Sequence, residues 1–571
     1  MPTAADTRLQ LEQKLAEEHR FPPLLARVFA GRWHRSQEAA SPYLDPVIEK
    51  CRGISASPAL EEMLALLQRA REKQLPVLFF GDYDADGVIS TAMLFQVSQH
   101  LGMKSNYYLP SRFNEGYGLS MRVIRIAGEK GYRLLFALDC GTGNLEEVEA
   151  AEKLGLEVIG LDHHSPGPEP PRFALVNPHL DRGIDSLCTA GLAFFFVHHW
   201  LAAAGGGAST VGQDFLELAA IATIADVVPL VGDSFCLAHL GLAKLPQTQN
   251  TGLRALLNAL RLGGLEFLTW RDVAFKLVPH INAAGRMAHA KQAAELLLSR
   301  DPGSAEPLAS QLLHLNTLRR NQQEETYAQA SQQALAQADA EVLVLYQPDW
   351  NQGVTGVVAA KVAETFAKPV LIFSDLSSAS GVAVGSGRAP AGVDLLATME
   401  PARPLFARFG GHASALGGLI KTGELGRLRA LLNERRPVAC VQTPEAAVAE
   451  AEATPDEVGG TEVLRTLAAL YPFGEGHPPP RVLIRDARIS RVEVIGRDRT
   501  HLAISVDRSG QDGPLRIIGF QQSHREHLLR QCRSADLLVE LELDNFGNRL
   551  AVQPRLQEAY PSQPDGLRSQ V

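Results

Sequence analysis

The chain has 571 residues, which at roughly 100–200 residues per domain predicts about three to five domains. Its 45% hydrophobic and 21% charged residues are enough for several packed cores and exclude a wholly disordered protein. The formal net charge of −9 excludes a protein that coats nucleic acid through overall positive charge, and leaves room only for a local basic groove.

No segment is expected to cross a membrane or to direct export. The first twenty residues mix charges and lack the apolar core of a signal peptide. The uncharged stretch at 186–213 has too short an apolar part for a membrane helix, so a buried helix is expected there. The six cysteines contain no Cys-x-x-Cys pair, which indicates a reducing compartment and argues against a zinc site. We therefore expect a cytoplasmic protein.

The first half of the chain predicts helices followed by a parallel α/β domain. Residues 1–75 have helical spacing of apolar residues, and we expect them to pack on the domain that follows at 76–300. That domain contains short apolar runs that alternate with helical stretches, which is typical of a parallel sheet with helices on its faces. The runs lie at 77–80, 134–138 and 157–161.

The second half begins with a Gln- and Ala-rich stretch that predicts one long, largely exposed helix joining two halves, at 301–340. A second α/β region follows at 341–448. The acidic segment 449–460 contains Pro and Gly and is expected to be a linker.

The C-terminal region, 461–558, is rich in β-strands after Arg481 and is followed by a tail at 559–571. About five strands, with a helix at 523–532 between the later ones, fit a small OB-like barrel. Such barrels often bind single-stranded nucleic acid, although a purely structural barrel explains the strands equally well.

Acidic and histidine residues directly follow the three apolar runs of the first domain. The carboxyl ends of parallel strands meet at one edge of a sheet, where ligands bind, so we expect these side chains to converge. A further carboxylate, Asp226, ends an apolar helix. The residues at the strand ends are Asp82, Asp84 and Asp86 after the first run, Asp139 after the second, and Asp162, His163 and His164 after the third.

Carboxylates in such a cluster repel one another unless a cation neutralises them. Oxygen ligands with one imidazole suit Mg²⁺ or Mn²⁺, and the histidine favours Mn²⁺. A calcium loop of the EF-hand type is excluded because its twelfth position, counted from Asp82, is Met93. Helix capping explains one aspartate at a strand end, but three such ends in series favour a metal site.

Motifs along the whole chain resemble one family. In order, they are GDYDADG (81–87), ALDCGTGN (137–144), LDHH (161–164), PHINAAGRM (279–287), WNQGVTGVVA (350–359), SGR (386–388) and GGHASALGG (410–418). Together they resemble the DHH phosphoesterase superfamily, and within it the RecJ family of single-stranded-DNA exonucleases, from about residue 40 to about residue 555. The resemblance implies an α/β fold in which a parallel-sheet DHH domain is joined by a long helix to an α/β DHHA1 domain, followed by an OB-like β-barrel.

The resemblance also implies two bound Mn²⁺ or Mg²⁺ ions. One would be held by Asp86, Asp139, His163 and Asp226, and the other by Asp84 and a bridging Asp139. Asp82 and His164 match positions that support the site or approach the phosphate, and Asp162 belongs to the same Asp-His-His motif. The residues that the resemblance assigns to substrate are Arg112, Asn282, Arg286, Ser386, Arg388, Gly410, Gly411 and His412.

Three positions depart from the family pattern. Phe80 stands where many small-molecule members have a histidine, so the second ion is expected to depend on substrate phosphate. His280 stands where RecJ proteins usually have Arg, which weakens any assignment of a phosphate contact to that position. His477 stands where Asn is usual, away from the metal set.

The implied activity is hydrolysis of single-stranded DNA to mononucleotides in the 5′→3′ direction, in DNA repair and recombination, by water activated at two metal ions. The resemblance implies single-stranded DNA as partner, with a single-strand-binding protein, a helicase and a monomeric state as family expectations. Two alternatives stay open. An enzyme for short oligonucleotides or small phosphoesters would not need the region after Arg481, and a non-catalytic DNA-associated scaffold would be expected to have lost metal carboxylates.

Overall fold

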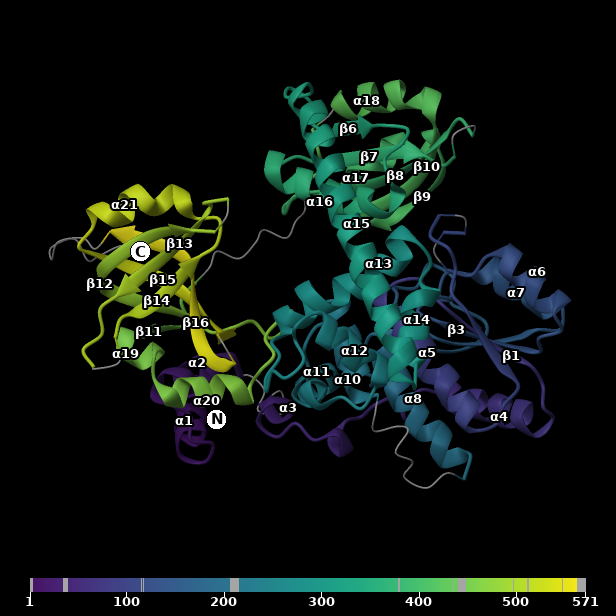
Figure 1. The fold of residues 1–571 in the computed structure, drawn as a ribbon, viewed down its shortest axis with the longest axis horizontal. Coiled ribbons are helices and arrows are strands. Elements are labelled where there is room, and N and C mark those ends of the chain that lie inside the picture. The colour runs from purple at the N-terminus through teal and green to yellow at the C-terminus, as the bar shows by residue number, and fades with distance from the viewer. Residues whose placement is uncertain are drawn as a thin grey trace.

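The computed structural model describes residues 4–33, 40–113, 115–116, 118–205, 215–377, 380–434, 436–439, 448–496, 498–510, 513–546 and 548–561. Figure 1 shows two α/β parts joined by one long helix, with a separate barrel beside the first of them. We call these parts the first domain, the second domain, the connecting helix and the barrel.

The first domain is built on a five-stranded parallel sheet in the order β2-β1-β3-β4-β5. Two helices, α5 and α8, pack with Phe79 and Phe136 on one face, and α6 and α7 pack with Phe80 and Leu135 on the other. The three predicted strands are confirmed. The elements are β1 (Val77–Gly81), α5 (Ala85–His100), β2 (Ser105–Tyr108), α6 (Met121–Glu129), β3 (Leu134–Leu138), α7 (Leu145–Lys153), β4 (Glu157–Leu161), β5 (Ala174–Val176) and α8 (Thr189–Ala203).

Helices complete the first domain. The uncharged stretch at 186–213 contains the buried core helix α8, as expected, and its residues 206–213 lie outside the described part. Over the described residues, no helix is both long and apolar enough to cross a membrane. The remaining helices are α10 (Leu216–Ala225), α11 (Asp233–Lys244), α12 (Thr251–Ala259), a π-helical turn (Asp272–Leu277), α13 (Val278–Met287) and α14 (Lys291–Leu298).

The connecting helix α15 (Pro302–Leu335) confirms the long helix that the sequence predicts. Its first half packs on α12, α13 and α14, and its second half packs on the second domain through α16 and β6. The second sheet has the order β6-β7-β8-β10-β9, with β6 parallel to β7 and the other pairs antiparallel. Its elements are β6 (Leu343–Tyr346), α16 (Gln352–Phe366), β7 (Val370–Asp375), β8 (Val382–Arg388), α17 (Leu395–Met399), β9 (Phe406–His412), β10 (Ala415–Lys421) and α18 (Leu425–Asn433).

The barrel has the order β12-β13-β14-β16-β15 and closes because β15 also pairs with β12. Five long strands with a helix before β15 match the predicted OB-like pattern. The elements are α20 (Thr461–Ala469), β12 (Arg481–Ile495), β13 (His501–Val506), β14 (Leu515–Gly519), α21 (Glu526–Gln531), β15 (Ser534–Phe546) and β16 (Arg549–Pro561).

The expected linker at 449–460 is wrong as a description of this segment. Strand β11 (Ala451–Ala453) adds to the barrel beside β12, and α19 (Pro455–Val458) follows with a capping box between Thr454 and Glu457. An acidic composition with Pro and Gly is as compatible with an edge strand and a capped turn as with a linker.

The N-terminal segment divides between two parts of the molecule, which corrects the expectation that it packs on the first domain throughout. Helix α4 (Ala59–Glu72) lies on β5 and α8, but α2 (Pro23–Trp33), which packs with α1 (Ala4–Glu17), lies on β11 and α20 of the barrel side (Figure 1). The Arg32 guanidinium donates to both carboxylate oxygens of Glu450, at 2.5 and 2.6 Å. Apolar spacing predicts a helix but not the surface against which it packs.

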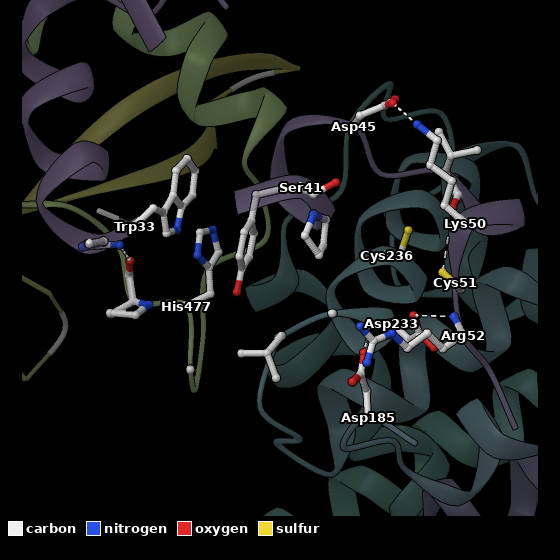
Figure 2. Close-up of a pocket in the computed structure, with 18 of the residues that line it drawn as sticks. Trp33, Ser41, Asp45, Lys50, Cys51, Arg52, Asp185, Asp233, Cys236 and His477 are labelled. Carbon is white, nitrogen blue, oxygen red and sulfur yellow. Dashed lines mark hydrogen bonds and ion pairs between the residues drawn. The ribbon is translucent and has the colours of Figure 1, made fainter. Parts of the chain in front are cut away.

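A cavity of about 810 Å³ lies where the N-terminal segment, α11 and the entry to the barrel meet. Figure 2 shows Trp33 and His477 on one side, and Cys51, Asp233 and Cys236 on the other. None of the metal-site candidates at the strand ends lines it.

His477 is buried at this junction, with only 2% of its surface exposed. Its Nε2 lies 2.9 Å from the Leu470 carbonyl oxygen, and the Tyr43 ring stacks on it at a centroid distance of 4.3 Å. Burial lowers the pKa of His477 to about 3. Rings from the N-terminal segment, the first domain and the barrel entry surround it, namely Phe29, Tyr43, Phe235 and Phe473.

We predict that His477 makes the fold sensitive to acid. Its pKa is about 3 in the folded state, against 6.5 for an ordinary histidine side chain, so below about pH 6.5 the unfolded chain binds the extra proton. Stability should therefore fall as the pH drops from about 6.5 towards 3. The measurement is urea unfolding at several pH values for the wild type and His477→Asn, in which this part of the pH dependence should disappear.

The exposed His524 provides the control, because His524→Asn should retain the wild-type pH dependence. An unchanged pH profile in His477→Asn would contradict the prediction.

Candidate metal centre

The predicted strand-end residues converge in the structure. Strands β1, β3 and β4 are adjacent and parallel, so their carboxyl ends lie at one edge of the first sheet (Figure 1). Three overlapping groups have ligand atoms within 4.8 Å of one another: Asp86, His163 and Asp226; Asp82, Asp84 and Asp139; and Asp139, His163 and His164.

His163 lies at the centre of the cluster. Its Nε2 is 3.2 Å from Asp226 Oδ2, 3.4 Å from Asp139 Oδ1 and 3.8 Å from Asp86 Oδ2. This nitrogen is buried and has no hydrogen-bond partner. A buried imidazole nitrogen that faces three carboxylate oxygens is suited to a metal ion.

The apolar helix α8 positions two of the carboxylates. The backbone N–H groups of Thr189 and Ala190, at the first turn of α8, donate to the two oxygens of Asp86 at 2.7 Å each. The Thr189 hydroxyl donates to Asp139 Oδ1 at 3.2 Å. The N-terminus of a helix favours negative charge, so α8 supports an ionised Asp86.

Asp82, Asp84 and Asp139 form the second side of the cluster. Asp84 caps α5, because its Oδ1 accepts hydrogen bonds from the N–H groups of Asp86 and Gly87 at 3.1 and 3.2 Å. Asp82 is buried, and its Oδ1 has no hydrogen-bond partner. Asp139 has a left-handed backbone with φ of 62°, a strained conformation that often marks functional sites.

The electrostatics require a counter-charge. Burial, followed by repulsion from neighbouring carboxylates, raises the pKa of Asp139 well above its ordinary value and that of Asp226 to about 8. Burial likewise raises the pKa of Asp82 and Asp86, and lowers the pKa of His163. The donor set of carboxylates with one neutral imidazole therefore fits Mn²⁺ or Mg²⁺.

Asp162 belongs to none of these three groups and instead binds the residues around them. It accepts hydrogen bonds from the Thr142 hydroxyl at 2.6 Å and from the His163 N–H at 2.8 Å, and lies 2.8 Å from His164 Nδ1. Burial opposes ionisation of Asp162, but these contacts lower its pKa. Burial also opposes the charged form of His164, but Asp162 raises the pKa of this histidine to about 9.

Sequence reasoning missed three residues that support the cluster. Besides Thr189, they are Thr142 and Asn177. The Asn177 amide donates to the Thr142 hydroxyl at 2.9 Å and to the His164 carbonyl oxygen at 3.0 Å. Asn177 directly follows β5 and Thr189 begins α8, whereas Thr142 lies four residues after β3, within the 137–144 motif.

Three of the predicted substrate residues lie at the junction of the two domains. Arg112 lies 4.0 Å over the Tyr83 ring, and Arg286 donates to the Gly353 carbonyl oxygen at 3.1 Å. Burial and the neighbouring Arg112 lower the pKa of Arg286 to about 10. The Oδ1 of Asn282 is buried without a hydrogen-bond partner.

Two glycines permit this junction. A Cβ on Gly285 would lie 2.4 Å from the Tyr83 carbonyl oxygen, and one on Gly353 would lie 2.0 Å from the Arg286 carbonyl oxygen. Gly285 therefore lets α13 approach the Tyr83 backbone within the first domain, and Gly353 lets the start of α16 approach α13, which explains the glycines in two of the sequence motifs.

The other predicted substrate residues belong to the second domain. Ser386 Oγ lies 3.3 Å from Thr355 Oγ1, and Arg388 donates to the Gly387 carbonyl oxygen at 2.8 Å. Gly410, Gly411 and His412 are on the edge strand β9. Within the described residues, no hydrogen bond or ion pair joins any of these five residues to the cluster of the first domain.

Two of the departures from the family pattern are explained by packing. Phe80 is fully buried and stacks on Tyr108 at 5.9 Å between centroids, on the sheet face that contacts α6 and α7. His280 lies 2.5 Å from the Lys276 carbonyl oxygen and 2.9 Å from the Asn316 amide, so both ring nitrogens are engaged.

Three family models match separate parts of the chain. The DHH family N-terminal domain matches residues 76–223, the DHHA1 domain matches residues 339–435, and the RecJ OB domain matches residues 449–558. The first match covers the strand-end cluster apart from Asp226, the second covers the second domain, and the third covers the barrel with β11.

Similar proteins extend over nearly the whole chain. The single-stranded-DNA-specific exonuclease RecJ of Bacillus subtilis is 30% identical over 564 residues, which is 96% of this chain and 70% of the relative. The exonuclease of the same name from Haemophilus influenzae is 30% identical over 554 residues, covering 92% of this chain and 94% of the relative. A crystal structure of RecJ from Thermus thermophilus in complex with Mn²⁺ has a TM-score of 0.78 at 27% identity, and covers 99% of this chain and 79% of that one.

We predict different losses for a ligand and for a supporting residue. His163→Ala removes the central nitrogen and should reduce Mn²⁺ affinity more than about 100-fold. Asp162→Asn leaves the ligands in place but weakens the hydrogen bonds to His164 and Thr142. Its affinity for Mn²⁺ should therefore fall about 10- to 100-fold. Calorimetric titration with Mn²⁺ measures both.

The exposed Asp349 offers the control, and Asp349→Asn should bind Mn²⁺ like the wild type. If His163→Ala and Asp162→Asn lose the same affinity for Mn²⁺, the distinction between a ligand and a supporting residue is wrong.

Proposed function

The chain belongs to the RecJ family, and from that premise we propose that it is a metal-dependent 5′→3′ exonuclease that hydrolyses single-stranded DNA to mononucleotides in DNA repair and recombination. The observation that carries the proposal is the convergence of Asp86, Asp139 and Asp226 on the unpartnered Nε2 of His163. This is the arrangement needed to hold a divalent cation beside a phosphate.

The strand-end cluster would hold two Mn²⁺ or Mg²⁺ ions. Asp86, Asp139, His163 and Asp226 would bind one, and Asp84 would bind the other together with Asp139 as the bridging ligand. When bound, the ions activate water as the nucleophile and offset the negative charge that develops on the phosphate. No side chain is required as a covalent nucleophile.

The remaining residues of the cluster orient these ligands. Asp162 fixes the position of His164 through Nδ1, and the raised pKa of His164, about 9, keeps this imidazole protonated at neutral pH. We therefore assign His164 to the phosphate as a cationic group. Asp82 has a carboxylate oxygen within 4.8 Å of ligand atoms of Asp84 and Asp139, and we assign it to the support of this second side of the site.

Binding of the substrate would involve both domains. Arg112, Asn282 and Arg286 lie at the domain junction, and the buried guanidinium of Arg286 is near enough to Asp84 for this carboxylate to act on the pKa of the arginine. Guanidinium groups bind phosphate oxygens with two parallel hydrogen bonds, and this would position the scissile bond. From the second domain we assign the same task to Ser386, Arg388, Gly410, Gly411 and His412.

The barrel would hold the incoming strand by stacking and backbone contacts. Its presence also distinguishes this chain from an enzyme that acts on small phosphoesters, which would not need it. We further propose a cytoplasmic location, a monomeric state, and cooperation with a single-strand-binding protein and a helicase, which would supply single strands.

We expect the chain to degrade a long single-stranded DNA from its 5′ end. The substrate is labelled at either end and incubated with Mn²⁺ or Mg²⁺. Mononucleotides should be released from the 5′ label first, and cleavage should stop on chelation of the metal. In Asp139→Ala, which lacks the shared ligand, the rate should fall more than about 100-fold.

Three outcomes would contradict the proposal in different ways. Release from the 3′ label first would reverse the polarity. Degradation of di- to pentanucleotides without long DNA would favour the small-substrate enzyme. Binding of DNA without cleavage would favour the scaffold.

A further inference from the structure

The connecting helix α15 carries a polar face where it crosses the domain junction. Asn316 and Thr326 are buried on this helix, with Arg319 and Gln322 between them at intervals of three or four residues. Residues at this spacing lie on one side of a helix. Helix α15 packs on α16 of the second domain and on α13, which carries Asn282 and Arg286 and which Asn316 contacts through His280.

Polar atoms at this junction are buried without hydrogen-bond partners. On α15 they are Asn316 Oδ1, Arg319 Nε and Gln322 Oε1. Two more are Asn282 Oδ1, on α13, which packs on α15, and Arg112 Nε, from a residue whose charge acts on Arg286 together with that of Arg319. Buried polar groups in folded proteins nearly always have partners, so atoms of this kind from three segments indicate a surface made to bind a polar ligand.

His280 does not supply positive charge to this surface. Its Nδ1 faces the Lys276 carbonyl oxygen and donates to it, which leaves Nε2 to accept a hydrogen bond from the Asn316 amide. The ring is therefore neutral. Burial lowers the pKa of His280, and the positive charges of Arg319 and Arg320 lower it further, which places both guanidinium groups near the ring.

Arg319 also lies beside the substrate arginines. Burial lowers the pKa of Arg286, and the charges of Arg112 and Arg319 contribute to that shift. Within the described part of the chain, Arg112, Arg286 and Arg319 form no ion pair with a carboxylate, and the Nε of Arg319 has no partner. Arg286 and Arg112 lie near the carboxylates of Asp84 and Asp82. By contrast, burial and the charge of Arg320 lower the pKa of Arg319, with no carboxylate among the causes, so its part-buried guanidinium is the one suited to bind an added anion.

We propose that Arg319 of the connecting helix binds a backbone phosphate of the single strand, namely the phosphate adjacent to the one at Arg286. Asn316 and Gln322, on the same face, contact the neighbouring sugar or phosphate. The proposal rests on the proposed function and deepens it, because it makes the helix that joins the two domains part of the DNA site. Guanidinium and amide groups are the usual donors to the nucleic-acid backbone.

The test compares Arg319→Gln with Arg320→Gln, which removes the same charge from the next, exposed position. Both are made in the Asp139→Ala background, so that a 5′-phosphorylated single-stranded oligonucleotide is bound without being cleaved. Affinity is measured at several salt concentrations. Arg319→Gln should weaken binding about tenfold and reduce the slope of log K against log salt by about 0.7, the value for one phosphate contact to a single strand. Arg320→Gln should leave both unchanged.

Steady-state kinetics of the same two variants with Asp139 intact provide a second measurement. Arg319→Gln should raise KM with little change in kcat, because the phosphate contact is made equally before and during the reaction. Arg319→Lys keeps the charge but not the forked donors, and should retain the salt slope with a smaller loss of affinity.

Two results would overturn the proposal. Equal effects of Arg319→Gln and Arg320→Gln would mean that only the general charge of the helix matters. The second is a salt slope that is unchanged in both Arg319→Gln and Arg319→Lys, together with a lower thermal midpoint in Arg319→Gln. Arg319 would then stabilise the packing of α13 on α15 and would not bind DNA. If the wild type cleaves no single-stranded DNA, the proposed function fails, while the binding experiment still reports on Arg319.

Discussion

Repulsion among carboxylates at one sheet edge is the constraint on which the rest of this molecule depends. Parallel strands bring their carboxyl ends together, and here those ends carry Asp82, Asp139 and Asp162. Part of the negative charge is balanced within the chain, since α8 donates two N–H groups to Asp86, and His164 with Thr142 supports Asp162. The remaining negative charge requires divalent cations. Cations at this edge of the sheet would in turn attract the phosphate groups of a substrate.

The arrangement of the predicted substrate residues follows from the same excess of negative charge. A chain with a net charge of −9 has to gather its positive groups locally if it is to bind a phosphate backbone. It does so where α13, α15 and α16 meet, and the close approach permitted by Gly285 and Gly353 keeps Arg286 beside the metal cluster. The connecting helix is thus both a spacer between domains and, in our proposal, a donor of Arg319 to the DNA.

The N-terminal helices connect the barrel to the first domain. Helix α2 is bound to the barrel side through Arg32 and Glu450, while α4 lies on the first domain. His477 is enclosed by aromatic rings of the N-terminal segment, the first domain and the barrel entry. This packing orients the barrel relative to the first domain.

The sequence by itself determined the chemistry of the site. The convergence of the strand-end carboxylates with His163 could be predicted because each follows a strand that is recognisable from its apolar residues, and parallel strand ends converge by geometry alone. The assignment of Asp86, Asp139, His163 and Asp226 to one ion came from the resemblance to the family and remains a prediction. The alternation of strands and helices, the long helix and the barrel strands were predictable for the same reason, since they depend on local periodicity.

Only the tertiary structure decided which distant surfaces meet. It placed α2 on the barrel, added β11 to the barrel sheet, and gave Thr189 and Asn316 their partners Asp139 and His280. Each of these contacts joins segments far apart in the chain, and their residue types are equally compatible with an exposed position. Local sequence predicts an element and its apolar face, but the partner of that face is selected by the packing of the whole molecule.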